Sequence, residues 1–91
     1  MTEAKFQLGS LVATPGALSV LTTAGQSPLS LVARHVAGDW GEVCRDDARL
    51  NDQAVRSGDR IVSVYSVAGV KLYLITESDR SSTCLLQADE Y

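Results

Sequence analysis

A capping pattern that occurs twice in the first half of the chain constrains the fold more than any other feature. Thr14-Pro15 precedes an apolar segment that ends at Gly25, and Ser27-Pro28 precedes another that ends at Gly38. A hydroxyl before a helix accepts a backbone N–H, proline suits the first turn, and a left-handed glycine ends the last turn. The pattern therefore predicts a hairpin of two helices, at residues 15–24 and 28–37.

The segments on either side of this hairpin are less regular. Phe6 and Leu8 alternate with polar neighbours, which is compatible with a short strand or an extended arm, and Gly9 weakens a strand there. A third helix is predicted at 46–57, where Asp46 or Asp47 could cap the first turn. We expect this helix to lie on the surface, because few of its residues could enter a core: Leu50, Ala54 and Val55.

The residue period changes after Asp59. Two segments rich in β-branched and aromatic residues are separated by Ala68-Gly69, which has the length of a hairpin turn. The pattern predicts strands at 60–67, 70–76 and, after a polar turn, 82–87. Pairing Val67 with Val70 places Tyr65 opposite Leu72 and Ser63 opposite Leu74. The other face of this hairpin then carries Val62, Val64, Tyr73 and Ile75.

Helices followed by an antiparallel meander are typical of the α+β class. We expect one domain, residues 1–91, in which two or three N-terminal helices pack on a C-terminal three-stranded antiparallel meander. A chain of 91 residues leaves no room for two independent cores. The predicted core consists of Leu18, Leu21, Val32, Val36, Ile61, Leu72, Leu74 and Leu85.

The charge balance argues against whole classes of partner. Eight Lys and Arg stand against 11 Asp and Glu, and the net charge is −3. Nonspecific nucleic-acid binding depends on a basic surface, so we do not expect it, nor do we expect binding to a membrane. The first residues contain no apolar signal segment, which predicts a cytoplasmic location.

Cys44 and Cys84 are the two cysteines of the chain. Neither belongs to a CxxC or Cys/His pattern, so we expect no metal site and no cofactor. One disulfide is conceivable, but two free buried thiols are the expectation for a cytoplasmic protein.

The stretch from Arg34 to Gly41 contains the single histidine, His35, and the single tryptophan, Trp40. Asp39 could orient His35 as a general base, or His35 could bond a backbone carbonyl or a carboxylate near the end of its helix. Trp40 is either a core residue at the helix–sheet junction or an exposed binding anchor. We predict a structural hub here and no catalytic residue.

The polar turn at 76–83 is a second candidate ligand site. Arg80 could bind a phosphate or carboxylate with two hydrogen bonds, beside Asp79. The alternative is a solvated hairpin end whose Asp and Ser side chains bond their own backbone.

A set of short motifs runs along almost the whole chain: Val12–Leu18, Ser27-Pro28, Arg34-His35, Gly38–Gly41, Asn51-Asp52, Arg60-Ile61, Ile75–Glu77, Asp79-Arg80 and Glu90-Tyr91. Together they resemble a family of short bacterial proteins carried on plasmids, integrative elements or phages. Members are described as plasmid-related or hypothetical, and some are labelled restriction–modification components. The resemblance implies a genomic context and no reaction. Cys84 departs from the pattern, where a β-branched or hydroxyl residue is expected.

These observations favour a non-enzymatic accessory protein of mobile genetic elements that acts by binding another protein. One alternative is an anti-defence inhibitor that mimics DNA, although 11 acidic residues are few for that role. A small toxin-like ribonuclease is the other alternative, which would need a basic groove for RNA. The candidate binding residues are Arg34, His35, Asp39, Trp40, Asp79 and Arg80.

Overall fold

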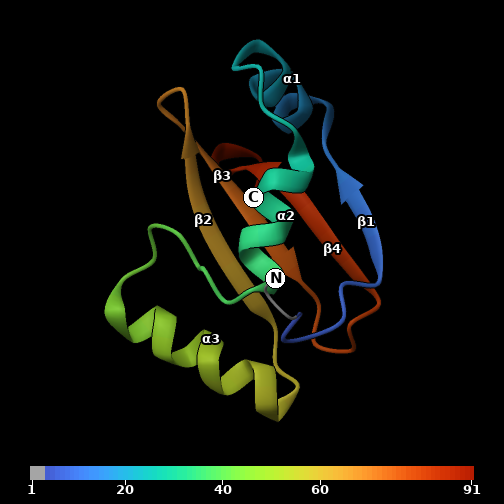
Figure 1. Ribbon diagram of the computed structural model, residues 1–91, viewed down its shortest axis with the longest axis vertical. Helices are drawn as coiled ribbons and strands as arrows, with labels where there is room; N and C mark the ends of the chain where they lie inside the picture. The colour runs from blue at the N-terminus through green and yellow to red at the C-terminus, as the bar shows by residue number, and fades with distance from the viewer. Residues whose placement is uncertain (1–3) are drawn as a thin grey trace.

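A computed structural model describes residues 4–91, which form a four-stranded sheet and three α-helices (Figure 1). The α+β class is as predicted. The elements in chain order are β1 (Ser10–Ala13), α1 (Pro15–Thr23), α2 (Pro28–Val36), α3 (Arg45–Ser57), β2 (Ile61–Val67), β3 (Val70–Thr76), β4 (Ser82–Gln87) and a 3-10 turn, η1 (Ala88–Glu90).

The first two helices begin as the capping pattern predicts. The Thr14 hydroxyl accepts the Ala17 N–H at 3.1 Å, and the Ser27 hydroxyl accepts the Leu29 N–H at 3.2 Å. The third helix begins one residue earlier than predicted. Its cap is the Cys44 Sγ, which accepts the Asp47 N–H at 3.5 Å. The prediction of an Asp cap is wrong because Asp46 and Asp47 lie inside the first turn, where acidic side chains favour the positive end of the helix dipole.

The predicted hairpin register is confirmed along its whole length. Val67 pairs with Val70, Tyr65 with Leu72 and Ser63 with Leu74. The two-residue turn at Ala68-Gly69 fixes this register, and each residue along the hairpin then follows the alternation of a strand.

The predicted three-stranded meander is incomplete, since the N-terminal segment adds a fourth strand. β1 runs parallel to β4, with Ser10 beside Ser82 and Ala13 beside Leu85, and the strand order is β1-β4-β3-β2. The sheet is therefore mixed. A free β4 edge would leave backbone groups unpaired, and residues 10–13 satisfy them after the chain passes Gly9.

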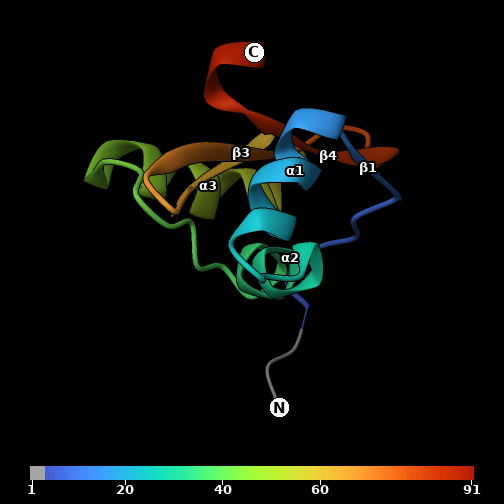
Figure 2. The ribbon, with the colours of Figure 1, turned by 90° about the horizontal axis from the view of Figure 1, so that it is seen from above.

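The helices and the sheet enclose two adjoining clusters of side chains. Figures 1 and 2 show α2 across one face of the sheet, α1 beyond the end of α2, and α3 beside β2. The larger cluster lies under α1 and α2 and consists of Ala17, Leu21, Leu31, Tyr65, Val67, Leu72, Leu74 and Leu85. The smaller cluster lies under α3 and consists of Trp40, Ala54 and Ile61, with Phe6, Val43, Ala48 and Val55 at its margin.

The prediction of the core is wrong at Leu18. α1 buries the stripe formed by Ala17 and Leu21, and this orientation turns Leu18 outward, 40% exposed. On α3 the buried residues are Asn51 and Ala54, while Leu50 is 61% exposed. Val32 and Val36 are half-buried. The other predicted core residues are all buried: Leu21, Ile61, Leu72, Leu74 and Leu85.

Two further predictions concern the whole chain. Cys44 and Cys84 are both free thiols, but the expectation that both are buried is wrong, because Cys44 is exposed at the start of α3 and Cys84 is half-buried. None of the helices within residues 4–91 has the length and apolar character needed to cross a bilayer.

The core assignment predicts a sharp difference between two kinds of leucine. Leu72→Ala or Leu74→Ala should lower the free energy of unfolding by about 2–5 kcal/mol, because each leaves a cavity in the larger cluster. Leu18→Ala is the matched control and should cost less than about 1 kcal/mol, since its side chain is largely solvated. Chemical denaturation measures all three, and equal losses at Leu18 and Leu72 would contradict the packing described above.

Candidate functional site

His35 lies at the centre of a buried chain of hydroxyl groups. The imidazole is fully buried on α2, with Nδ1 2.6 Å from the Ser63 Oγ and Nε2 2.8 Å from the Thr76 Oγ1. The Thr76 hydroxyl is 2.7 Å from the Thr83 hydroxyl, which donates to the Leu8 carbonyl at 2.8 Å. One thread of hydrogen bonds therefore joins α2, the three antiparallel strands and the N-terminal arm.

The direction of every proton in this thread follows from its last member. The Leu8 carbonyl can only accept, so Thr83 donates to it and must accept from Thr76. Thr76 has then used its single proton and accepts from the Nε2–H of His35. Nδ1 is left as an acceptor for the Ser63 hydroxyl. We infer the neutral Nε2–H tautomer for His35.

Because of this arrangement, His35 is not a candidate for a catalytic base that a substrate could reach. A serine 2.6 Å from an imidazole has nucleophile–base spacing. Ser63 and His35 are both fully buried, however, so a substrate cannot reach them. Burial also lowers the pKa of His35 from 6.5 to about 4. The predicted bond from His35 to a carbonyl or a carboxylate is wrong, because its partners are two hydroxyls.

Trp40 is a core residue, as the hub interpretation requires. Only 6% of it is exposed, and its indole N–H donates to the Asp52 Oδ1 at 3.0 Å. Its ring lies 6.1 Å from the Phe6 ring, which in turn meets the His35 ring edge-on at 5.1 Å. Trp40 thus links the buried thread to α3, and it is unavailable as an exposed anchor.

The backbone after Trp40 closes the outer edge of β2. The Val64 N–H donates to the Trp40 carbonyl at 3.0 Å, and the Glu42 N–H donates to the Val64 carbonyl at 2.7 Å. Gly41 lies against β2 with φ +74°, and a Cβ there would be 2.0 Å from the Val64 carbonyl oxygen. A glycine is therefore required at this contact.

Arg34 and Asp39 form an ion pair on the surface next to His35 and Trp40. Asp39 makes no hydrogen bond to His35. The Arg34 Nε is 2.7 Å from the Asp39 Oδ2, and its guanidinium lies 4.6 Å from the Tyr65 ring centroid. The hydrogen bond from Arg34 lowers the pKa of Asp39 and raises that of Arg34. Both side chains are about half exposed, so the pair itself adds little stability.

The polar turn at 76–83 holds the end of α3 in place. The Arg80 guanidinium donates to the carbonyls of Ala54 and Asp59, at 2.8 and 2.7 Å, and to those of Glu77 and Ser78. Cations at the carbonyl end of a helix are favourable. Asp79 accepts the Ser81 N–H at 3.0 Å, which closes the turn. These bonds match the solvated-turn alternative and leave Arg80 few donors for a ligand.

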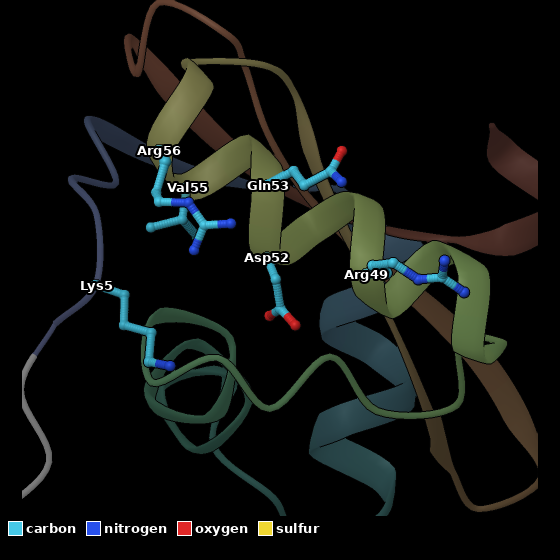
Figure 3. A pocket seen from close by; sticks show the side chains of 6 residues that line it. All are labelled: Lys5, Arg49, Asp52, Gln53, Val55 and Arg56. Atoms are coloured by element: carbon cyan, nitrogen blue, oxygen red, sulfur yellow. The ribbon is translucent and has the colours of Figure 1, made fainter.

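A polar hollow of about 410 Å³ lies between α3 and the N-terminal arm (Figure 3). Figure 3 shows Lys5 reaching toward it from the arm, Asp52 within it and Arg56 above it. The Asp52 carboxylate already accepts the Trp40 indole, and the hollow is open to solvent. Its cations are ordinary solvated side chains, so the hollow is a poor candidate for a built ligand site.

The sheet face opposite α2 is a further candidate surface. Strand register places its apolar side chains in two rows across the sheet. The first row is Val12, Cys84, Ile75 and Val62, and the second is Leu86, Tyr73 and Val64. We call these seven residues the open face, because α2 lies on the other side of the sheet (Figure 2). Val12 is 53% exposed, Ile75 is buried, and the other five side chains are half-buried.

Two exposed apolar side chains lie at the margin of the open face, and one of them is hydrogen-bonded to an arginine. Leu50 and Tyr91 are 61% and 64% exposed. The Tyr91 ring meets the Tyr73 ring edge-on at 5.6 Å, and the Arg60 guanidinium donates to the Tyr91 hydroxyl at 2.9 Å. Two hollows of about 410 and 240 Å³ flank the Arg60–Tyr91 pair. An apolar centre with aromatic and arginine side chains at its edge is the composition of a protein-binding surface.

Sequence reasoning missed most of the polar thread and both margins of the open face. The signal for Ser63 was present, since the predicted register placed it opposite Leu74 on the core face. A buried hydroxyl needs a partner, and the single histidine is the natural one. Phe6 carried no such signal, because its alternation with polar neighbours did not show which residues it would contact. Asn51 was hidden in a polar helix, yet its amide exchanges two hydrogen bonds with the Val62 backbone.

The depressed pKa of His35 makes stability depend on pH. The unfolded chain gains a proton near pH 6.5 and the folded chain only near pH 4. The contribution of His35 is complete above pH 6.5 and falls by about 3 kcal/mol as the pH drops from 6.5 to 4. NMR titration of the single histidine should show a neutral ring at pH 5.5. A midpoint between pH 6 and 7 would contradict the buried thread.

Removing the Trp40 ring should destabilise the protein. Trp40→Ala should lower the free energy of unfolding by about 3–5 kcal/mol, because the smaller cluster loses its largest side chain. Asp52→Ala should cost about 1–3 kcal/mol, since the indole N–H then lacks its partner. Tyr91→Ala is the exposed aromatic control. Circular dichroism in denaturant measures these losses, and a Trp40→Ala variant as stable as the Tyr91→Ala control would refute the hub.

Comparison with families of known proteins, with curated proteins and with solved structures finds no match for this chain. The geometry of the chain itself therefore carries the functional argument.

Proposed function

We propose that the protein is a non-enzymatic accessory protein of mobile genetic elements that binds another protein through the open face. The observation that carries this proposal is the double row of seven apolar side chains across all four strands. In a two-layer fold the second face of an antiparallel sheet is ordinarily polar. Here the alternate positions are apolar on both faces of the central strands.

The candidate catalytic groups are engaged elsewhere, which supports a binding role. His35 is buried with hydroxyls on both ring nitrogens. The buried Trp40 indole donates to Asp52, and Arg34 and Asp39 are paired with each other. Arg80 donates to backbone carbonyls. Each of these residues acts on the fold, so the open face is the feature left for function.

The two alternative functions draw less support. A ribonuclease needs cations free to contact phosphates, whereas Arg34, Arg49 and Arg60 each face a carboxylate. A DNA mimic needs unpaired acidic side chains in a regular array, and Asp39, Asp46 and Glu77 are the partners of those arginines. The mobile-element context rests on the resemblance of the short motifs alone.

The test is affinity purification from the native host with matched baits. A Leu50→Asp/Tyr91→Asp variant places charges at the margin of the open face, on side chains whose exposure protects the fold. Leu18→Asp places a charge on an exposed position of α1, outside the open face. The wild type and Leu18→Asp should retain a common partner, and the double variant should lose most of it, on the order of tenfold or more. Circular dichroism confirms that all three baits fold.

Two results would count against the proposal. A partner retained equally by all three baits would place the interface elsewhere. Cleavage of RNA by the purified wild type, abolished by a substitution away from the open face, would favour the ribonuclease alternative.

A further inference from the structure

The two outer edges of the sheet are treated differently by the chain. On β2, the Val62 backbone is paired by the Asn51 side chain, and the Val64 backbone is paired by Trp40 and Glu42. β1 forms the other outer edge, and Figures 1 and 2 show no element beyond it. The β2 edge is therefore closed at Val62 and Val64, whereas the β1 edge is open.

The hydrogen bonds of β1 show which backbone groups point outward. The Ser10 N–H donates to the Ser81 carbonyl, and the Thr14 N–H donates to the Leu85 carbonyl. A parallel ladder bonds to alternate residues, so Ser10, Val12 and Thr14 face β4. The N–H and C=O groups of Leu11 and Ala13 therefore face away from β4.

We propose that β1 is a dimerisation edge that pairs antiparallel with β1 of a second copy of this chain, about a twofold axis through Val12. In this register Leu11 of each copy exchanges two backbone hydrogen bonds with Ala13 of the other. Val12 lies directly opposite Val12 in a non-hydrogen-bonded pair. The proposal does not rest on the function proposed for the open face, although Val12 belongs to both surfaces.

Side-chain chemistry favours a second copy as the occupant of this edge. Residues 8–18 contain no charge, so a twofold axis brings no like charges together. Edge strands of monomeric proteins are commonly protected by lysine or proline, and residues 10–13 contain neither. Leu11 faces the small Ala13 of the partner, and two β-branched Val12 side chains suit a cross-strand pair.

In the proposed dimer, an apolar groove beside β1 lies next to the Leu11 side chain of the second copy. The groove has a volume of about 210 Å³ and is lined by β1, by residues of β3 and β4, and by Pro28, Leu29 and Val32 of α2. Leu11 and Leu29 at its mouth are 51% and 65% exposed. The partner's Leu11 lies opposite Ala13, at the mouth of this groove.

The small size of the edge sets the expected affinity. Four strand residues and the mouth of one groove bury less than the ~800 Å² per partner of a standard interface. We therefore expect a weak, reversible dimer, with a dissociation constant in the range of about 10 μM to 1 mM.

The register can be tested by disulfide trapping in a Cys44→Ser/Cys84→Ala background. The background is needed because Cys84 lies beside Val12 within one chain. Val12→Cys should form an intermolecular disulfide, since paired Cα atoms would lie about 4.5 Å apart. Ser10→Cys is the control on the same strand and the same face, and its two copies would lie about 14 Å apart. Val12→Cys should cross-link about tenfold faster or more.

Sedimentation equilibrium of the wild type and three variants decides which surface associates. Val12→Lys and Leu11→Asp alter opposite faces of β1, and both should leave a monomer at ~1 mM, whereas Leu50→Lys should dimerise like the wild type. Association through the open face would instead be lost in Val12→Lys and Leu50→Lys and kept in Leu11→Asp. That pattern, a monomeric wild type at ~1 mM, or equal cross-linking of the two cysteine variants would overturn the proposal.

Discussion

The buried imidazole and its three hydroxyls are the constraint on which the rest of the fold depends. His35 belongs to a helix, Ser63, Thr76 and Thr83 belong to successive strands, and the thread ends on the carbonyl of Leu8. Every member uses its single proton once, and no buried side-chain nitrogen or oxygen within residues 4–91 lacks a partner. A shift of any layer would leave a polar group unpaired in the core.

This thread also explains why the N-terminal arm is ordered into the sheet. The Leu8 carbonyl accepts from Thr83, and two residues later β1 begins its ladder with β4. Phe6, just upstream, stacks against Trp40 and meets His35. The arm has little regular structure, so side-chain contacts with the hub hold it against the sheet.

Local sequence signals predicted most of the helices and strands, whereas contacts between distant segments were not predicted. The caps at Thr14 and Ser27 and the turn at Ala68-Gly69 act over three or four residues, so the sequence displays them directly. Joining β1 to β4 depends on a contact across some 70 residues of sequence. A four-residue strand after a glycine carries no pattern that reveals its partner.

The candidate site shows the same division. His35 and Trp40 were identified as a hub from their position beside a helix end, but their partners came from strands and from α3. Asp79 and Arg80 were correctly placed in a turn, whereas the destination of the Arg80 donors depends on where α3 ends. The alternation of apolar residues on both faces of the hairpin was visible in the sequence, and only the layer order showed which face α2 leaves open.

Closure of the β2 edge by Gly41 and Asn51 limits how large any assembly of this chain can become. A sheet with two open edges can add copies without end, which is the route to fibres. Here one edge is sealed by the chain's own backbone and by an asparagine amide, so sheet extension ends after a single pairing event. Replacing Gly41 by a larger residue would push the loop off Val64, expose a second edge and make polymerisation possible.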